Sequence, residues 1–468
     1  MISIITNQKI LEELIMQTNE KKVAYINEYN RQQMITKNTY PTFIAERILK
    51  EYKAQDKYIK TIFEDDVIYL YDGKKGVWEK TIDDYIKKDI RQFLIKHNND
   101  LDKRNSINEV FSALEDITAD KENKKLFNLA VNPDLRYINL ENGMYDTEKQ
   151  KLLDHDPEYY SICQIPVEYN SKAECSKWKE ALKQWIPDKK TIMFLQEYVG
   201  HCLIPDTRHE KAIILLGEGN NGKSTFLEVI SRLFGEDNLS GLSIDRLTKK
   251  SRFETANLKD KLVNIYNDVD PKIIKDTGLI KTIISGQTLR AEKKYITSQD
   301  TKLVSRLIFA ANRLPKAVDA KRAWYRRFEI VRFPNSFTPN DDCFDIDYKY
   351  KLCNELSGIL NWALEGLHRL KQNNVFTTSA SLKKEKLKYK GVNDPIESFY
   401  ESKIVDSPGN VIDKKEVYGE YVKFCEQLGI EAETQRTLTM KLKDLGIESK
   451  RKSINGDKIR CYLGIKLK

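Results

Sequence analysis

The nine residues GEGNNGKST, from Gly217 to Thr225, constrain the fold of this chain more than any other stretch. They follow the apolar run AIILL and precede an amphipathic segment, STFLEVISRLFG, that closes at Gly235. The pattern G-x-x-x-x-G-K-[ST] is that of a phosphate-binding loop, whose small residues let backbone N–H groups turn toward phosphates. A strand before it and a helix after it favour a true phosphate loop over an ordinary Gly-rich turn.

The motif predicts ATP and Mg²⁺ as cofactors and gives a role to each residue type. Lys223 is expected to bridge the β- and γ-phosphates, and Ser224 is expected to ligate Mg²⁺. The remaining loop residues are expected to cradle the phosphate chain through their backbone. The predicted nucleotide-binding residues are Gly217, Gly219, Asn221, Gly222, Lys223, Ser224 and Thr225.

Four short apolar runs predict an α/β core around this loop. Helical or loop segments of the length that crossovers need lie between them. The runs lie at 212–216, 262–266, 306–311 and 328–333. The sequence therefore predicts a nucleotide-binding α/β fold.

Two of these predicted strands end in polar residues suited to phosphate chemistry. A phosphate loop needs a second acid that holds the metal and the attacking water. Asp268 is predicted to fill this role, and Asn312 is predicted to orient the water or sense the γ-phosphate. The alternatives are an acid that merely ends a strand in solvent and an Asn favoured by the local turn.

Composition bounds the rest of the chain. Its 468 residues exceed one ordinary core, which predicts several domains. No apolar run reaches the roughly 18 residues that span a bilayer, and the N-terminus does not read as a signal peptide, so the predicted location is cytoplasmic. The seven scattered cysteines indicate neither a zinc site nor a disulfide framework. The net charge of +9 suits a polyanionic partner, although a solvated Lys-rich surface explains much of it.

A series of motifs in this order resembles the superfamily 3 DNA helicases of phages, plasmids and mobile elements. After the phosphate loop come LVNIYNDVD, TIISGQTLRAEKKY, LIFAANRLP and WYRRFEIVRFP. The chain is more narrowly similar to the poxvirus-type primase-helicase branch. INLENGMYD and CSKWKEALKQW, both upstream, look like the domain that precedes the helicase in that branch.

The resemblance implies an AAA+-like ATPase that forms a ring, hexameric as in the family, around DNA. In this family a hairpin lines the central channel, and here it would carry Lys293, Lys294 and Tyr295. Two lysines beside an aromatic residue grip single strands by charge and stacking. The alternative is a solvated Lys pair.

Arg326 and Arg327 match the family's arginine finger region. One of them would reach the neighbouring subunit's ATP and stabilise transition-state charge, while the other would pair with a carboxylate. The sequence does not distinguish the two.

The chain departs from the family pattern at two places. Asn267 stands where the family usually has the first of two adjacent acids, which leaves open whether Asp268 or Asp270 serves the metal or the water. In addition, only some 50 to 65 residues precede the recognisable region. A helicase without its own primase is therefore predicted.

The C-terminal segment predicts a winged-helix domain. Two helices, one capped by Asp413 and the next beginning near Thr434, precede a basic hairpin around Asn455-Gly456. A lysine-protected, soluble strand edge is the alternative to DNA binding. The predicted DNA contacts are Arg436, Lys441 and Lys443 on the recognition helix, and Lys450, Arg451, Lys452, Lys458 and Arg460 on the wing.

Five segments are predicted in total. They are an N-terminal helical segment (1–60), an α+β domain before the helicase (61–205), the ATPase core (206–340), a helical extension and linker (341–392) and the winged-helix domain (393–468). A Lys-rich stretch at 382–391 is expected to be the link to the last domain.

The function predicted from these parts is an ATP-dependent DNA helicase and replication initiator of a phage or mobile element. Its expected partners are single- and double-stranded DNA, the replication origin, further copies of itself and host replication proteins, with no membrane. One rival is an ATP-switched origin-binding protein without unwinding activity. Another is a small-molecule kinase, which leaves the KKY segment and the basic wing unexplained.

Overall fold

The computed structural model describes residues 40–468 except for 63–66, 98–102, 120–133, 249–255, 271–273, 275, 294–295, 318–321, 339–340, 342–344, 346 and 455–456. The chain divides into two compact units, residues 1–168 and 169–468. Each unit is described by itself. The five finer boundaries expected from the sequence stay predictions.

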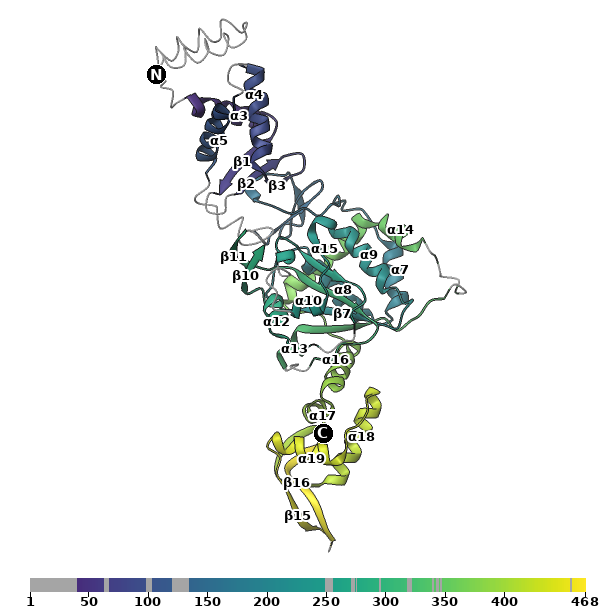
Figure 1. Ribbon diagram of the computed structural model, residues 1–468. Coiled ribbons are helices and arrows are strands. Elements are labelled where there is room, and N and C mark those ends of the chain that lie inside the picture. Colours follow the sequence, from purple (N-terminus) through teal and green to yellow (C-terminus); the bar gives the residue numbers. More distant parts are fainter. Residues whose placement is uncertain are drawn as a thin grey trace. The chain divides into compact units, whose positions relative to one another are not determined.

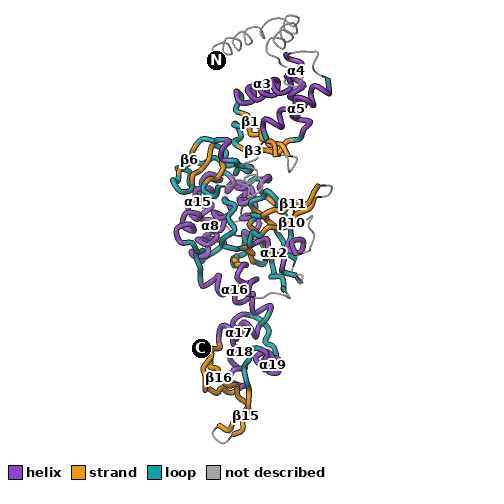
Figure 2. The backbone as a smooth tube through the Cα atoms, turned by 90° about the vertical axis from the view of Figure 1, so that its left-hand side faces the viewer, coloured by secondary structure: helices purple, strands orange, loops and turns teal. Residues whose placement is uncertain are grey.

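In its described residues, the first unit contains two antiparallel meanders and three α-helices. Strands β1 (Lys57–Ile62), β2 (Val67–Asp72) and β3 (Val77–Thr81) form one sheet, and β4 (Tyr137–Leu140), β5 (Gly143–Asp146) and β6 (Lys151–Leu153) form the other. Helices α3 (Tyr40–Ala54), α4 (Asp83–His97) and α5 (Arg104–Thr118) lie on one side of the first sheet (Figures 1 and 2). The hairpin predicted for VIYLYDGKKGVWEK is confirmed as β2–β3.

The two faces of the first sheet have different cores, because side chains alternate along each strand. Ile59 packs with Ile90 of α4 and Leu114 of α5 in an aliphatic core under the helices. On the opposite face, Tyr71 and Trp78 pack at 5.4 Å between ring centroids. The sheet is therefore buried by helices on one face and by aromatic packing on the other.

The second unit is built on a five-stranded parallel sheet with the order β13-β7-β12-β9-β8. Its strands coincide with the four predicted runs, except that β9 and β13 are each one residue shorter and a two-residue edge strand, β8, is added. Every residue of β7 and β12 is buried, as expected for parallel strands covered on both faces. The strands are β7 (Ala212–Leu216), β8 (Leu239–Ser240), β9 (Val263–Tyr266), β12 (Arg306–Ala311) and β13 (Phe328–Arg332).

Helices cover this sheet. Trp178 of α7 (Ser176–Trp185) stacks on Phe226 of α9 (Lys223–Phe234) at 5.5 Å. The hydroxyl of Tyr198, on α8 (Lys189–Cys202), donates to the Leu307 carbonyl of β12 at 2.9 Å. The other helices around the sheet are α10 (Ile244–Thr248), α12 (Gly278–Ile284), α13 (Arg322–Arg327), α14 (Tyr348–Cys353) and α15 (Leu356–Asn373).

Two glycines let α8 and α15 lie side by side (Figures 1 and 2). A Cβ atom added at Gly200 would lie 2.2 Å from the Ala363 carbonyl oxygen. One added at Gly366 would lie 2.2 Å from the Gln196 carbonyl oxygen. Since backbone atoms cannot give way as a side chain can, neither position accepts a larger residue.

The Lys-rich stretch at 382–391, expected as a link, is part of a packed helix, α16 (Ala380–Asn393). Its buried Tyr389 donates to the Pro315 carbonyl at 3.0 Å and accepts from the Trp324 indole at 3.2 Å. The surrounding lysines hid this apolar stripe. That this stretch links the core to the last domain stays a prediction, and the structure adds that α16 packs on β13 and α13.

The C-terminal module contains three helices and a three-stranded antiparallel sheet with the order β14-β16-β15. The predicted helix, helix, hairpin order is present, and β14 was not predicted because Ser-Pro-Gly-Asn in its middle is typical of a loop. Its register shifts between Asp406 and Val411. The elements are α17 (Pro395–Lys403), β14 (Ile404–Asp413), α18 (Lys414–Leu428), α19 (Gln435–Asp444), β15 (Ser449–Ile454) and β16 (Asp457–Leu467).

We expect Gly366→Ala to destabilise the second unit by about 1–3 kcal/mol, since the added methyl group overpacks the α8–α15 contact. The matched control is Gly419→Ala in α18, where a Cβ atom meets nothing within 4 Å. That variant should gain about 0.5–1 kcal/mol from helix propensity. Thermal unfolding of both variants measures the difference. Equal shifts would show that the two helices are not in close contact.

Candidate nucleotide-binding site

Three parallel strands bring the predicted site residues to one edge of the sheet. The loop from Gly217 follows β7, Asn267 and Asp268 follow β9, and Asn312 follows β12. β12 pairs with both β7 and β9, so the carboxyl ends of all three strands are adjacent. Such an edge is the usual ligand site of an open parallel sheet.

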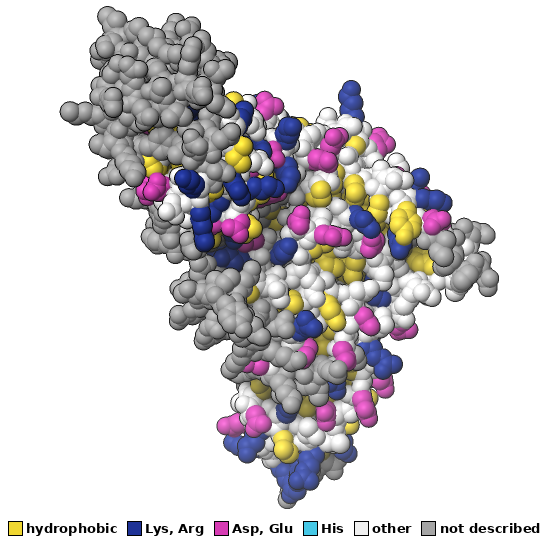
Figure 3. Space-filling view, turned by 45° about the horizontal axis from the view of Figure 1, so that its top comes forward, with side chains coloured by type: hydrophobic (Ala, Val, Ile, Leu, Met, Phe, Trp, Pro, Cys, Tyr) yellow, Lys and Arg dark blue, Asp and Glu magenta, His cyan; other side chains and the backbone are white. Residues whose placement is uncertain are grey.

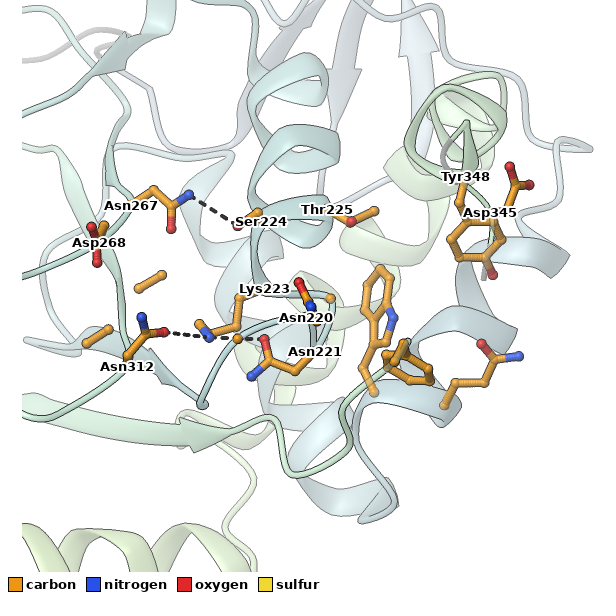
Figure 4. Close-up of a pocket in the computed structure, with 17 residues that line it drawn as sticks. Asn220, Asn221, Lys223, Ser224, Thr225, Asn267, Asp268, Asn312, Asp345 and Tyr348 are labelled. Atoms are coloured by element: carbon orange, nitrogen blue, oxygen red, sulfur yellow. Dashed lines mark hydrogen bonds between the residues drawn. The ribbon is translucent and has the colours of Figure 1, made fainter. Parts of the chain in front are cut away.

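Lys223 lies at the centre of this edge (Figure 4). Its Nζ donates to the Gly217 carbonyl at 2.7 Å, to Asn221 Oδ1 at 3.0 Å and to Asn312 Oδ1 at 3.4 Å. Only 5% of Lys223 is exposed. Burial lowers the pKa of its ammonium, while Asp268 acts in the opposite direction. Three neutral oxygens therefore hold a buried cation in the position where the motif expects it.

Ser224 has an amide rather than a carboxylate beside it. Asn267 Nδ2 donates to Ser224 Oγ at 3.2 Å, while Asp268 lines the same cavity with a left-handed φ of 66°. The backbone N–H of Val269 donates to the Ala310 carbonyl at 2.8 Å and so ties this turn to β12. A serine hydroxyl and one carboxylate are oxygen donors of the kind that Mg²⁺ prefers. They fit a metal that also takes ligands from phosphate.

A cavity of about 500 Å³ opens above these residues. Residues 219–225 line its phosphate-loop end, and side chains that the sequence analysis missed line other parts of it. Figure 4 shows Tyr348 and Asp345 at the far end, away from Asn267 and Asn312. The missed residues are Gln184, Trp185, Phe337, Asp345 and Tyr348.

The Trp185 indole lies against the last glycine of the phosphate loop. A Cβ atom at Gly222, whose φ is 87°, would lie 2.4 Å from the Trp185 Nε1. The buried indole is itself packed edge-on against Trp178, with 6.0 Å between ring centroids. The last glycine of the motif is thus required by its left-handed conformation and by the indole beside it.

Arg326 and Arg327 do not line the cavity of their own chain. Both contact Glu210, Arg327 with 3.1 Å between Nη2 and Oε2. Arg327 is buried and also donates to Ser285 Oγ at 2.7 Å, whereas the Arg326 side chain is 63% exposed. The structure therefore separates two arginines that the sequence could not distinguish.

A hairpin is present where the channel hairpin was predicted, as β10 (Thr288–Lys293) and β11 (Ile296–Lys302), which pair antiparallel, and its place in a channel stays a prediction. Lys293 is the last residue of β10 and pairs with Ile296 across the turn. Lys294 and Tyr295 lie outside the described residues, as does the side chain of Lys293. Their predicted contacts with DNA stay predictions.

The C-terminal basic residues differ in their surroundings. On α19, Arg436 is exposed, whereas Lys441 Nζ pairs with an Asp394 carboxylate oxygen at 2.5 Å. On the hairpin, Arg451 stands directly opposite Arg460. Dark blue side chains gather at the lower tip of Figure 3, over this hairpin. The exposed members are Lys450, Arg451, Lys452 and Arg460, and the side chain of Lys458 lies outside the described residues.

Like charges directly opposite on a sheet repel, which is unfavourable unless an anion lies nearby. Lys414 adds a third cation, since proximity to Arg460 contributes, after burial, to lowering its pKa. This basic surface of Arg451, Arg460 and Lys414 is therefore suited to a polyanion.

Two family models match the chain. One, described as D5 N terminal like, matches residues 45–187, and the other, a family of unknown function named DUF5906, matches residues 215–327. An Acanthamoeba polyphaga mimivirus protein named "Putative helicase L207/L206" is 26% identical over 215 residues. That alignment covers 44% of this chain and 22% of the mimivirus protein, so the chain spans about a fifth of its relative.

The apo A form of the NrS-1 C-terminal region has a similar fold, with a TM-score of 0.50 at 14% identity. The match covers 89% of this chain and 98% of that one. The predicted resemblance to phage and viral primase-helicases is confirmed. The D5 N terminal like match includes both upstream motifs, INLENGMYD and CSKWKEALKQW, on which part of that prediction rested. Among the described residues, no helix is long and apolar enough to cross a membrane.

We expect Gly222→Ala and Trp185→Ala to be coupled in a double-mutant cycle. Gly222→Ala should lower the free energy of unfolding by about 1–3 kcal/mol through backbone strain. The contact of the added methyl group with the indole should lower it further. Trp185→Ala removes the indole and should relieve the loss of stability that comes from this contact. The double variant should therefore be more stable than the sum of the two single changes predicts. Thermal or urea unfolding provides the measurement.

The control is Gly219→Ala, which has a left-handed φ of 114° but no atom within 4 Å of the added Cβ. Gly219→Ala should lower the free energy of unfolding through backbone strain, and its effect should add to that of Trp185→Ala without coupling. Equal coupling for both glycines would contradict the proposed support of the loop by the indole.

Proposed function

We propose that the chain is an ATP-dependent DNA helicase that acts in replication of a phage, virus or mobile element. The observation that carries this proposal is the convergence of Lys223, Asn312 and the Ser224–Asn267 pair at one sheet edge. Only a ligand with a phosphate chain would use all of them. The family matches support a helicase-like role, and the motifs favour a superfamily 3, AAA+-like ATPase core.

In this proposal the phosphate loop holds the β-phosphate, and Lys223 leaves its three neutral oxygen partners for the β- and γ-phosphates. Mg²⁺ bound with ATP would neutralise phosphate charge. Ser224 and Asp268 would supply its protein ligands. Asn312 is positioned beside Lys223, so it would hold the attacking water or register the presence of the γ-phosphate.

The far end of the cavity would take the base and ribose. Tyr348 and Phe337 offer ring faces, and Gln184 offers a polar edge, in a pocket that is partly apolar. The missed residues thereby complete a site of about 500 Å³, which suits a nucleoside triphosphate better than a free phosphate.

A ring of subunits would complete the site, with Arg326 as the finger. Its exposure and its absence from the cavity of its own chain favour action on a neighbour's phosphate. Arg327 would instead hold α13 in place through Ser285 and Glu210. The proposed number of subunits, six, rests on the family resemblance, because contacts within one chain do not determine it.

Two surfaces would bind DNA. The β10–β11 hairpin would follow one strand through the channel as ATP is hydrolysed. The α17–β16 module would bind duplex DNA as a winged helix, with Arg436 on α19 and the basic surface of the hairpin. Origin recognition would then load the ring.

One rival is favoured by a specific observation. The Asn267 side chain places an uncharged amide beside Ser224, and the family usually has an acid at the position of Asn267. Slow hydrolysis would suit an ATP-switched origin-binding protein that assembles on DNA without unwinding it.

Strand displacement separates the two functions. We expect the wild-type chain to displace one strand of a forked duplex with ATP and Mg²⁺, and Lys223→Ala to bind the fork without displacing it. DNA-stimulated ATP hydrolysis without displacement would favour the switch. The absence of both hydrolysis and DNA binding would contradict the whole proposal.

Complementation between two inactive variants tests the shared site. Arg326→Ala keeps its own phosphate loop but lacks the finger, and Lys223→Ala has the opposite defect. Random mixing in equal amounts should restore about a quarter of wild-type ATP hydrolysis, because half of the sites are intact and half of their neighbours supply the arginine.

The matched control pairs Lys223→Ala with Asp268→Ala, since both lack an intact site and their mixture should stay inactive. Lack of recovery in the first mixture, with both variants folded and oligomeric, would remove Arg326 from the role of finger.

A further inference from the structure

The first unit contains a second cavity that the proposed function does not use. It lies along β1, between the ends of α3 and α5 and the segment at 157–158. Its volume is about 380 Å³. All of its lining residues belong to the first unit. The nucleotide site and both proposed DNA surfaces belong to the second.

Among the residues that the structure describes, three lysines line this groove, against one carboxylate, that of Glu158. Lys53 comes from the last turn of α3, and Lys57 and Lys60 come from β1. Among the described residues, neither Lys53 nor Lys57 forms an ion pair. Lys60 Nζ donates to the Tyr160 hydroxyl at 2.8 Å, and that hydroxyl donates to Glu158 at 3.3 Å. The described lining of the groove therefore carries a net positive charge, mostly at the end near Lys53 and Lys57.

Aromatic and apolar side chains accompany these cations. Tyr58, half-buried, also lines the groove, and its ring packs edge-on against Tyr71 with 5.9 Å between ring centroids. Tyr71 in turn packs against Trp78, which also lines the groove. A buried neighbour thus fixes the Tyr58 ring. Ile117, 41% exposed at the end of α5, adds an apolar wall.

We propose that this groove binds single-stranded DNA. Proteins that hold single strands combine a positively charged groove with aromatic rings on which unpaired bases stack. Lys53 and Lys57 supply the cations for successive phosphates, and Tyr58 with Ile117 supplies the surface for a base. Duplex DNA presents no unpaired base to Tyr58, so the groove selects single strands. This inference stands apart from ATP hydrolysis and from unwinding.

The salt dependence of binding by the full chain tests the proposal. Fluorescence anisotropy with a labelled oligothymidylate gives the affinity at several salt concentrations. Each phosphate contact removed should make the slope of log K against log salt shallower by about 0.7. The double variant Lys53→Gln, Lys57→Gln should therefore lose about 1.4 from the slope. Tyr58→Ala should weaken binding about tenfold with a nearly unchanged slope.

The matched control is Lys74→Gln, Lys149→Gln, which removes two exposed lysines of the same unit outside the groove. It changes net charge equally, and the slope should stay near that of the wild type. Equal losses in both double variants would show only an effect of net charge and would overturn the proposal.

A structural role for the lysines gives a different result. If Lys53 only neutralises the negative end of α3, its replacement lowers the unfolding temperature and leaves DNA affinity unchanged. That outcome also overturns the proposal. Photocrosslinking with 5-iododeoxyuridine locates the contact directly, and we expect the crosslinked peptide to contain Tyr58. Crosslinks confined to the second unit would count against the groove.

Discussion

Parallel pairing of β7 with β12 is the interaction on which the rest of the second unit depends. It sets the carboxyl ends of strands that are almost 100 residues apart side by side. The Gly217 N–H donates to the Ala311 carbonyl at 3.2 Å, so the phosphate loop begins where the strand before Asn312 ends. Because a parallel sheet is buried on both faces, only this edge remains for chemistry.

Packing among the helices holds the phosphate loop in place at the sheet edge. Phe226 at the start of α9 stacks on Trp178, and Trp178 lies beside the indole that supports Gly222. On the same helical layer, Gly200 and Gly366 let α8 and α15 approach closely. The loop thus gains its shape from aromatic packing beneath it as well as from its own glycines, which is why residues outside the motif matter for the site.

Much of this site could be predicted because its information is local. Lys223 and Ser224 belong to a motif, and Asp268 and Asn312 follow apolar runs whose ends are easy to locate. Trp185, Phe337 and Tyr348 carry no such signal, since they come from segments on either side of the core and resemble ordinary packing residues. The β10–β11 hairpin was expected through a family pattern, and its two central residues lie outside the described part of the chain.

The strands and helices likewise include some that could be predicted from the sequence and some that could not. β7 and β12 were predicted to the residue because their apolar runs have polar or glycine ends. β14 was missed because Pro408 and Gly409 favour a loop, and the tertiary pairing with β16 overrides that preference. In α16 the lysines mask Tyr389, whose burial depends on Trp324 and Pro315, 65 and 74 residues earlier. Only the folded chain shows such contacts.

The facing pair Arg451 and Arg460 has a consequence for the free chain. Each molecule must fold this hairpin against the repulsion of its own charges, and a bound anionic strand would remove that repulsion. Under the proposed function, part of the selectivity for polyanions would be set before any encounter, by the repulsion within the sheet. The hairpin would then be most stable when occupied, and its sequence would reflect a compromise between its own stability and the binding of its partner.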